Sequence, residues 1–209
     1  MRAIAQVLKA WDDRGAVRPF FIGIGGGSAA GKSTLAGELA EHLAPLVVEV
    51  VNQDRFFKKP AEMPTYFSAI NQGDRPAYNE PDSFKCEEMV SYCRSLHSGD
   101  VVILEGILVL WFAELRALMD CKIYIDADAD ERIIRRIRRN MKSLADYDSI
   151  TDYYLESVRF QHEEYNAPTR EYADMVIPGG MAETAERRQM AEELCATIAA
   201  HPSFGCSRA

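Results

Sequence analysis

The sequence predicts an α/β fold in which helices cover both faces of a five-stranded parallel sheet. Short apolar stretches alternate along the chain with segments of helical periodicity, as they do in proteins with parallel sheets. The motifs richest in glycine and polar residues follow directly after apolar stretches, where ligands bind in such sheets. A length of 209 residues with 47% hydrophobic content is enough for one domain with a sizeable core.

Five stretches are short, apolar and often β-branched, which favours strands. These predicted strands are residues 20–24, 46–51, 101–104, 121–126 and 175–177. Apolar residues at helical spacing predict the helices between them. The predicted helices are residues 4–11, the stretch from the glycine-rich loop to Pro45, and residues 84–97, 130–141, 148–165 and 182–200. Residues 52–82 show little periodicity and predict a long loop, which in a compact domain is usually either functional or a wrong assignment of the segment.

We expect residues 1–209 to form a single domain, with residues 1–19 as an N-terminal helical extension and residues 181–209 as a C-terminal helix. The net charge of −8 provides no basic surface for polymeric nucleic acid. The longest apolar run, within residues 101–112, is interrupted by Glu105 and is too short to span a membrane. No signal peptide is recognisable, and the five cysteines include no C-x-x-C pair. These features predict a cytoplasmic protein without membrane partners, and they leave self-association into a homo-oligomer open.

A phosphate-binding loop is predicted between the first strand and the helix after it. Residues 26–33 match G-x-x-x-x-G-K-[ST] in the strand–loop–helix context that this motif requires. Glycine lets backbone N–H groups turn toward an anion, and the helix N-terminus adds unpaired donors. In such a loop Lys32 meets the transferred phosphate and Ser33 offers its hydroxyl to Mg²⁺. The residues expected to bind ATP are Gly26, Gly27, Ser28, Ala29, Ala30, Gly31, Lys32, Ser33 and Thr34. The fold is therefore expected to be that of P-loop NTPases, which include kinases, GTPases and ATPases.

Two acidic residues stand near the ends of predicted strands. Glu105 follows a fully apolar strand, and together with Ser33 it supplies the hard oxygen ligands that Mg²⁺ prefers. The alternative is a strand-end acid that faces solvent, but Gly106 leaves room for close approach, which favours the metal site. Asp54 could accept a proton from an attacking hydroxyl, or it could only cap a loop. The residue pattern favours these two roles equally.

With these segments placed, the chain resembles the uridine kinase family, within the wider phosphoribulokinase/uridine kinase group. The similar stretches run in the family's order and span most of residues 20–180. They are residues 25–34, 52–58 (NQDRFFK), 78–84 (YNEPDSF), 101–110 (VVILEGILVL), 122–139 (KIYIDADADERIIRRIRR) and 172–180 (YADMVIPGG). The phosphate loop is generic, whereas the QD-x-FF, LEGIL and YAD-x-VIP-x-G segments are much more specific together.

The resemblance implies roles for individual residues. Asp54 matches the family's catalytic base, and Ser33 and Glu105 match its Mg²⁺ ligands. Phe57 lies where an aromatic side chain borders the nucleoside. The remaining residues that the resemblance places at the substrate are Tyr78 and Asn79, in the YNEPDSF segment, and Arg159, which matches a basic position just after the family's lid.

Three features depart from the family's pattern. Asn79 stands where the family has an Asp that binds ribose hydroxyls, and Asn cannot act as an anionic acceptor. The family's β-hairpin that reads the pyrimidine precedes the LEG strand, but here only a helix and a turn fit between Phe84 and Val101, so this hairpin is expected to be missing. The R-G-R-D segment of the family's lid is replaced near residues 142–146. These departures bear on the acceptor and not on the phosphate chemistry.

An arginine-rich segment follows the fourth predicted strand. On a helix, its arginines share one face except for Arg138, which points elsewhere. The residues on the shared face are Arg132, Arg135, Arg136 and Arg139. A solvated face balanced by nearby acids is one interpretation. We favour a short basic lid helix that brings at least one of Arg135, Arg136 and Arg139 to the triphosphate, and of these Arg135 and Arg139 are the catalytic candidates.

The sequence thus predicts an ATP- and Mg²⁺-dependent kinase with a small-molecule acceptor. Catalysis is assigned to Asp54, Lys32, Arg135 and Arg139, and the acceptor hydroxyl is expected to be the 5′-hydroxyl of a nucleoside such as uridine or cytidine. A nicotinamide riboside kinase or a sugar kinase of the same group is an alternative. A regulatory protein that hydrolyses the nucleotide without an acceptor is another, although the segment N-K-x-D of guanine-binding GTPases is absent.

Overall fold

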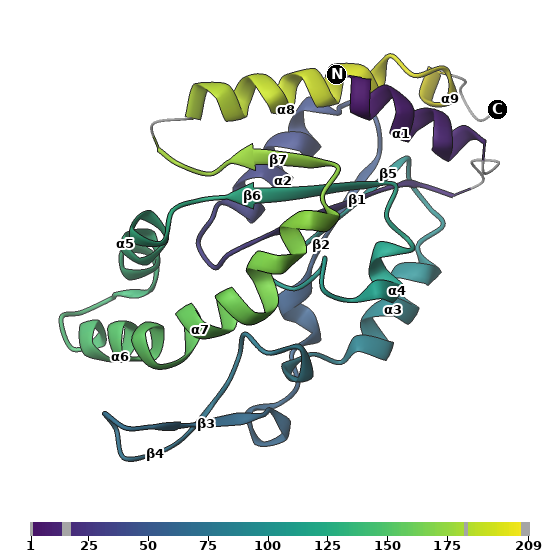
Figure 1. Cartoon of the computed structure of the whole chain (residues 1–209). Coiled ribbons are helices and arrows are strands. Elements are labelled where there is room, and N and C mark those ends of the chain that lie inside the picture. The colour runs from purple at the N-terminus through teal and green to yellow at the C-terminus, as the bar shows by residue number, and fades with distance from the viewer. Residues whose placement is uncertain (1, 14–17, 182–183, 206–209) are drawn as a thin grey trace.

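The computed structural model describes residues 2–13, 18–181 and 184–205 (Figure 1). Its centre is a five-stranded parallel sheet with the strand order β2-β5-β1-β6-β7. The strands are β1 (Phe20–Gly26), β2 (Val48–Asn52), β5 (Val101–Glu105), β6 (Cys121–Asp126) and β7 (Met175–Pro178). Each of the five strands predicted from the sequence is present, so the predicted fold class is confirmed.

Helices cover both faces of this sheet. The helices on one face are α1 (Arg2–Asp12), α2 (Lys32–His42), α8 (Thr184–Ala199) and the short α9 (Pro202–Gly205). On the other face lie α3 (Cys86–Ser95) and α4 (Ala113–Arg116). Alternate residues of β1 point to opposite faces, so Phe20 and Ile22 join the core with α2, whereas Phe21 joins the core with α3. Burial on both faces explains why the strands read as nearly continuous apolar runs.

The N-terminal helix is part of the first of these cores. Ile4, Leu8 and Trp11 are buried against the sheet and α8. The ring of Trp11 stacks on Phe204 in α9, with ring centroids 5.0 Å apart. Helices α1 and α9 therefore pack against each other, and Figure 1 shows them at the same side of the sheet. Ala182, where the sequence predicts the start of the C-terminal helix, lies outside the described residues.

The helical region after β6 is less regular than predicted. Helix α5 (Ala129–Asn140) is the expected basic helix, and α6 (Asp146–Tyr153) begins the next one. The single helix predicted for residues 148–165 is interrupted by two π-helical turns. After α6 come a π turn (Tyr154–Val158), α7 (Arg159–Gln161), a second π turn (His162–Asn166) and a 3-10 stretch (Ala167–Tyr172). Each π turn adds a residue to a helical turn and so changes which side chains face the sheet.

The segment predicted as a loop, residues 52–82, contains an antiparallel hairpin, so that prediction was wrong. Strands β3 (Thr65–Ser68) and β4 (Gly73–Pro76) pair with each other below the main sheet in Figure 1. Strands of four residues, one of them containing Gly73 and Pro76, are too short to show a period-two pattern in the sequence. Between Phe84 and Val101 the structure has α3 and no strand, as the sequence predicted. No helix among the described residues is long and apolar enough to cross a membrane.

Candidate active site

The predicted phosphate-binding loop connects the end of β1 to the first residue of α2. Two of its glycines adopt positive φ, with values of 140° at Gly26 and 105° at Gly31. A Cβ on Gly26 would lie 2.6 Å from the carbonyl oxygen of Ile125, so the neighbouring strand leaves no space for a side chain. The loop therefore turns tightly between strand and helix, with backbone donors at the N-terminus of α2.

Lys32, at the start of α2, is almost fully buried within this loop. Its side chain is 7% exposed, and Nζ donates a hydrogen bond of 2.8 Å to the carbonyl oxygen of Gly27. Burial lowers the pKa of Lys32 to about 8, while the nearby carboxylates of Glu105 and Asp54 favour its charged form. The ammonium group is thus held between the turn of the loop and two acidic side chains.

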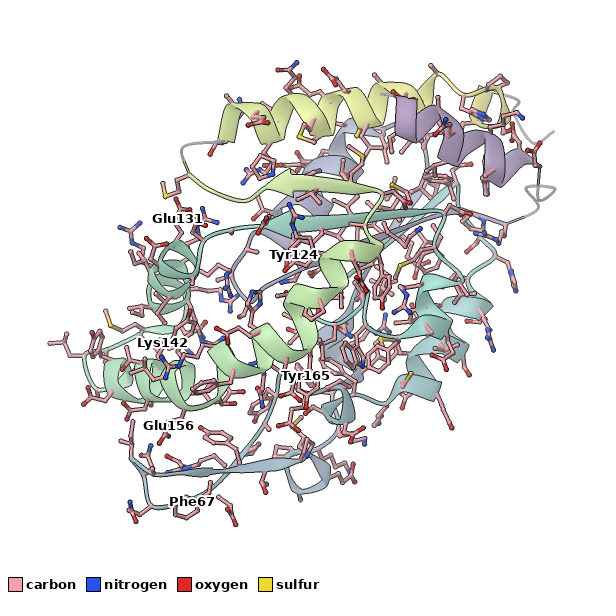
Figure 2. All side chains as sticks on the ribbon, in the orientation of Figure 1. Phe67, Tyr124, Glu131, Lys142, Glu156 and Tyr165 are labelled. Atoms are coloured by element: carbon pink, nitrogen blue, oxygen red, sulfur yellow. The ribbon has the colours of Figure 1, made fainter. Side chains whose placement is uncertain are left out.

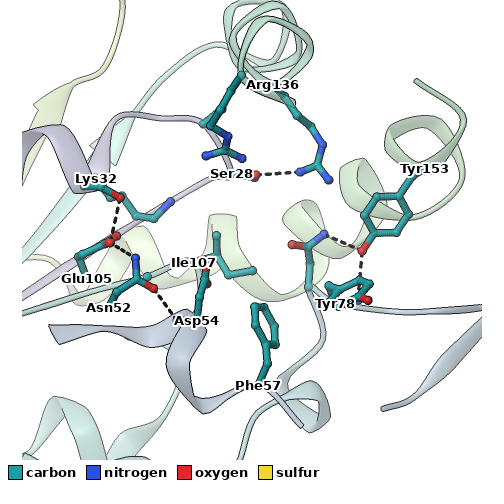
Figure 3. A pocket seen from close by; sticks show the side chains of 15 residues that line it. Ser28, Lys32, Asn52, Asp54, Phe57, Tyr78, Glu105, Ile107, Arg136 and Tyr153 are labelled. Atoms are coloured by element: carbon teal, nitrogen blue, oxygen red, sulfur yellow. Dashed lines mark hydrogen bonds between the residues drawn. The ribbon is translucent and has the colours of Figure 1, made fainter. Parts of the chain in front are cut away.

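A polar network joins the loop to the ends of β2 and β5 (Figure 3). Ser33 Oγ donates to Glu105 Oε1 at 2.9 Å, and the side-chain amide of Asn52 donates to the same oxygen. The Oδ1 atom of Asn52 accepts from the backbone N–H of Asp54 at 2.6 Å. Asn52 therefore links the Glu105 carboxylate to the backbone of Asp54. The one sequence signal for Asn52 is its position at the end of a predicted strand, whereas its place opposite Glu105 depends on the register of β2 with β5.

Asp54 lies in a 3-10 turn (Gln53–Phe56) directly after β2. Burial raises its pKa, and the charges of Lys32 and Arg139 partly oppose this shift. The turn is anchored by Gln53, which is fully buried and accepts a 2.9 Å hydrogen bond from the backbone N–H of Leu108. The side chain of Gln53 occupies the space that a Cβ on Gly106 would need, because such a Cβ would lie 2.3 Å from the Cβ of Gln53. The strand ends that carry Asp54 and Glu105 are therefore fixed against each other.

A cavity of about 370 Å³ opens between this network and Tyr78 and Asn79, which follow the hairpin in the chain. The predicted site residues that line it are Ser28, Ala29, Lys32, Ser33, Asp54, Phe57, Tyr78, Asn79, Glu105 and Arg139. Arg136, one of the arginines expected at the triphosphate, lines it too, as do Asn52 and Tyr153, which were not selected from the sequence. The structure thus brings residues from six separate segments of the chain into one cavity.

A second cavity of about 440 Å³ lies on the other side of the phosphate loop. Three predicted site residues line only this second cavity, namely Gly31, Thr34 and Arg135. Four more line both cavities. The shared residues are Ala29, Lys32, Ser33 and Arg139. Two ligands bound on either side would therefore meet at Lys32 and Arg139. This arrangement suits transfer of a group from one ligand to the other.

The arginines of α5 take different positions along the phosphate loop. Arg132 is buried against Gly27, and its Nε donates to the carbonyl oxygen of Ala127 at 3.0 Å. Arg135 donates to the carbonyl oxygen of Gly179 at 2.6 Å and forms an ion pair with Glu131, also at 2.6 Å. Arg136 instead reaches the loop itself.

Arg136 connects the basic helix α5 to the side of the first cavity that carries Tyr153. Its Nη1 donates to Ser28 Oγ at 2.9 Å, and its guanidinium carbon lies 5.3 Å from the centre of the Tyr153 ring. The Tyr153 hydroxyl in turn accepts from the backbone N–H of Tyr78 at 3.1 Å and from the Asn79 side chain at 3.5 Å. Figure 3 shows these residues across the cavity from Lys32 and Glu105. The predicted substrate residues Tyr78 and Asn79 are therefore held by a tyrosine from α6.

Among the predicted substrate residues, Arg159 is the one that lines neither cavity, and of the predicted ATP-binding residues Gly26, Gly27 and Ala30 line neither. Arg159 is exposed in α7, and its guanidinium carbon lies 4.4 Å from the centre of the neighbouring Phe160 ring. The π turn that precedes α7 changes the direction of the side chains that follow it. A sequence match to a basic position cannot detect such a change.

The chain is similar in sequence to the proteins of one family. The model of the phosphoribulokinase/uridine kinase family matches residues 57–185. A uridine kinase from Clostridium novyi (strain NT) is 35% identical over 190 residues, which cover 78% of this chain and 89% of that protein. A uridine kinase from Clostridium tetani (strain Massachusetts / E88) is 32% identical over 189 residues, covering 78% of this chain and 88% of the relative.

Solved structures of kinases share the fold at low sequence identity. A gluconokinase from Sinorhizobium meliloti 1021 superposes with a TM-score of 0.55 at 16% identity, covering 90% of this chain and 97% of that one. A shikimate kinase from Bacteroides thetaiotaomicron superposes with a TM-score of 0.54 at 15% identity, covering 85% and 98%. At these identities the likeness concerns the fold alone.

Proposed function

The chain belongs to the phosphoribulokinase/uridine kinase family and is an ATP-dependent kinase of a small molecule, and from this premise we propose that it phosphorylates the 5′-hydroxyl of a nucleoside, uridine or cytidine. The observation that carries the proposal is the first cavity. It places Asp54 near Lys32 at one end and the aromatic side chains of Phe57, Tyr78 and Tyr153 at the other. Aromatic rings suit the base and sugar of a nucleoside, and a carboxylate suits its hydroxyl.

The transfer requires one bond to form and one to break. The oxygen of the acceptor hydroxyl bonds to the γ-phosphorus of ATP, the bond between that phosphorus and the β–γ bridging oxygen breaks, and ADP leaves. Asp54 takes the hydroxyl proton in this scheme. Lys32 and Arg139, which line both cavities, stabilise the negative charge on the phosphoryl group as it moves between them.

Ser33 and Glu105 would hold the Mg²⁺ that accompanies ATP. Their oxygens lie 2.9 Å apart beside the phosphate loop, and a hydroxyl paired with a carboxylate is the hard-oxygen donor set that this ion takes. No group of three or more acidic, histidine or cysteine ligands occurs among the described residues. The ion would therefore take most of its ligands from phosphate and water, and it would neutralise charge on the triphosphate.

The direct test is a panel of acceptors offered with ATP and Mg²⁺. We expect uridine or cytidine to become the 5′-monophosphate and 5′-deoxyuridine, which lacks the reacting hydroxyl, to remain unchanged. Nicotinamide riboside and simple sugars belong in the same panel. Phosphorylation of a sugar or of nicotinamide riboside with no nucleoside product would contradict the proposed acceptor. Consumption of ATP that no acceptor increases would instead indicate a protein that only hydrolyses the nucleotide.

A further inference from the structure

A third pocket lies beside the first cavity, which contains Asp54 and is called the catalytic cavity below. This pocket lies between the hairpin β3–β4 and helix α6. Its volume is about 210 Å³. The residues that carry the argument below are Tyr66, Asn71, Arg75, Tyr78, Ser149 and Tyr153, all of which line it. We call it the hairpin pocket.

The hairpin pocket adjoins the catalytic cavity. Tyr78 and Tyr153 line both spaces, so they form a shared wall. Asp54 lies in the catalytic cavity on one side of this wall, and Tyr66 and Arg75 lie on the other. An acceptor with its hydroxyl at Asp54 would therefore reach the hairpin pocket with the part of the molecule that is remote from the hydroxyl.

The walls of the hairpin pocket suit a flat ring. The rings of Tyr66 and Tyr153 are inclined by 31° with centroids 5.9 Å apart, and Tyr78 meets Tyr153 edge to face with centroids 6.3 Å apart. Stacking on tyrosine rings holds a heteroaromatic base with little dependence on its substituents. The volume of about 210 Å³ leaves room for a six-membered ring.

The polar groups of the pocket favour carbonyl acceptors. Arg75 pairs directly across the hairpin from Tyr66, so their side chains share one face. Asn71 adds a side-chain amide that keeps one N–H beyond its bond to Ser68 Oγ, whereas the Ser149 hydroxyl donates to the carbonyl oxygen of Asp146. Arg75 is the only charged side chain that lines the pocket in the described part of the chain. A positively charged ring would face this cation, whereas a neutral ring with carbonyl oxygens could accept hydrogen bonds from it.

The hairpin is fixed to the helical region that carries Tyr153. Glu156, in the π turn after α6, accepts hydrogen bonds from Ser68 Oγ at 2.5 Å and from the backbone N–H of Ile70 at 2.8 Å. Figure 2 shows Glu156 above the hairpin and Phe67 on the hairpin's lower side. Both walls of the pocket therefore hold their spacing without a ligand.

We propose that the hairpin pocket binds the base of the acceptor, a neutral heteroaromatic ring of pyrimidine size that carries carbonyl groups. The proposal rests on the proposed nucleoside kinase activity and extends it, because it assigns base recognition to Tyr66 and Arg75 of a hairpin that lies before Tyr78 in the chain. The sugar would then lie beside Asn79 and the shared tyrosine wall.

The test compares Tyr66→Leu with Phe67→Leu, its neighbour on the same strand. Phe67 is 64% exposed and does not line the hairpin pocket, so it is a matched control for loss of an aromatic ring. Steady-state constants are measured with uridine and with methyl β-D-ribofuranoside, which has the same primary hydroxyl but no base. We expect Tyr66→Leu to raise KM for uridine about tenfold or more, because stacking on one aromatic ring is worth that much. KM for ATP and for the riboside should stay within about twofold of wild type, and Phe67→Leu should change none of these values.

Arg75→Gln provides a second variant that leaves the aromatic packing intact, and it should raise KM for uridine severalfold. The proposal is overturned if the wild-type enzyme phosphorylates uridine and both Tyr66→Leu and Arg75→Gln keep its KM. Should Tyr66→Leu fail to fold, Arg75→Gln alone decides. If the wild-type enzyme phosphorylates no nucleoside, the proposed function itself fails, and that result is read from the unmodified protein.

Discussion

Lys32 lies between two carboxylates and the turn of the phosphate loop, and burial lowers the pKa of its ammonium group to about 8. The group is charged below this pH and loses its proton above it. Since the free enzyme needs the cation to bind the triphosphate, kcat/KM for ATP should fall as the pH rises above about 8. Bound phosphate favours the charged form, so kcat should persist to higher pH. A kcat/KM that stays level to about pH 9.5 would contradict this role for Lys32.

A substitution of Glu105 tests whether this carboxylate holds the Mg²⁺ ion. Glu105→Gln removes a carboxylate charge while it keeps the shape of the side chain, so more Mg²⁺ should be needed for the half-maximal rate. Binding of ATP without metal should change much less. Glu114→Gln, an exposed acid in α4, is a suitable control. Identical Mg²⁺ titrations for wild type and Glu105→Gln would show that Glu105 does not hold the ion.

Sequence patterns could select Lys32, Ser33, Asp54 and Glu105 because each belongs to a motif beside a predicted strand. They could not select Asn52 or Tyr153. The contact of Asn52 with Glu105 depends on strand register, which the sequence does not state. Tyr153 reaches Tyr78 from a helix 75 residues later in the chain. Such long-range contacts follow from packing and leave no local signal.

At the scale of elements, α5 is the helix whose role can be tested most cleanly. Arg136 faces the loop and Ser28, whereas Arg138 is exposed on the opposite side. Loss of a charge-stabilising donor at the phosphate typically lowers the rate by about 10²–10³-fold, so Arg136→Gln should reduce kcat by about this factor. Arg138→Gln should leave kcat unchanged. Equal rates for the two variants would support the alternative interpretation of α5 as a solvated helix face.

The elements differ in how well the sequence predicts them. The five buried strands were found because burial on both faces requires continuous apolar runs. The hairpin β3–β4 was missed because its strands are four residues long and Phe67 on it is exposed. The π turns at residues 154–158 and 162–166 were missed as well, since helical periodicity predicts only the regular form.

At the scale of the whole molecule, we propose that the chain forms one domain around the central sheet. Side chains of α1 and α8 belong to the same core as β1, so the predicted N-terminal extension contributes to that core. The carboxyl ends of β1, β2 and β5 meet at one edge of the sheet, and both cavities border the phosphate loop there. The fold thereby places a donor and an acceptor on either side of Lys32.

The central claim is that a phosphoryl group passes between these two cavities to a hydroxyl held at Asp54. The measurement that tests it most directly is kcat of Asp54→Asn with the best nucleoside, alongside the Kd for ATP and the melting temperature. Asp82→Asn, an exposed acid in a neighbouring 3-10 turn, is the control. Asn keeps the shape of Asp but cannot take the proton, so kcat should fall by about 10²–10⁴-fold while the Kd for ATP stays within about threefold. A fall in kcat of less than about tenfold, together with a lower melting temperature, would contradict the claim and would leave Asp54 with a role only in the stability of its loop.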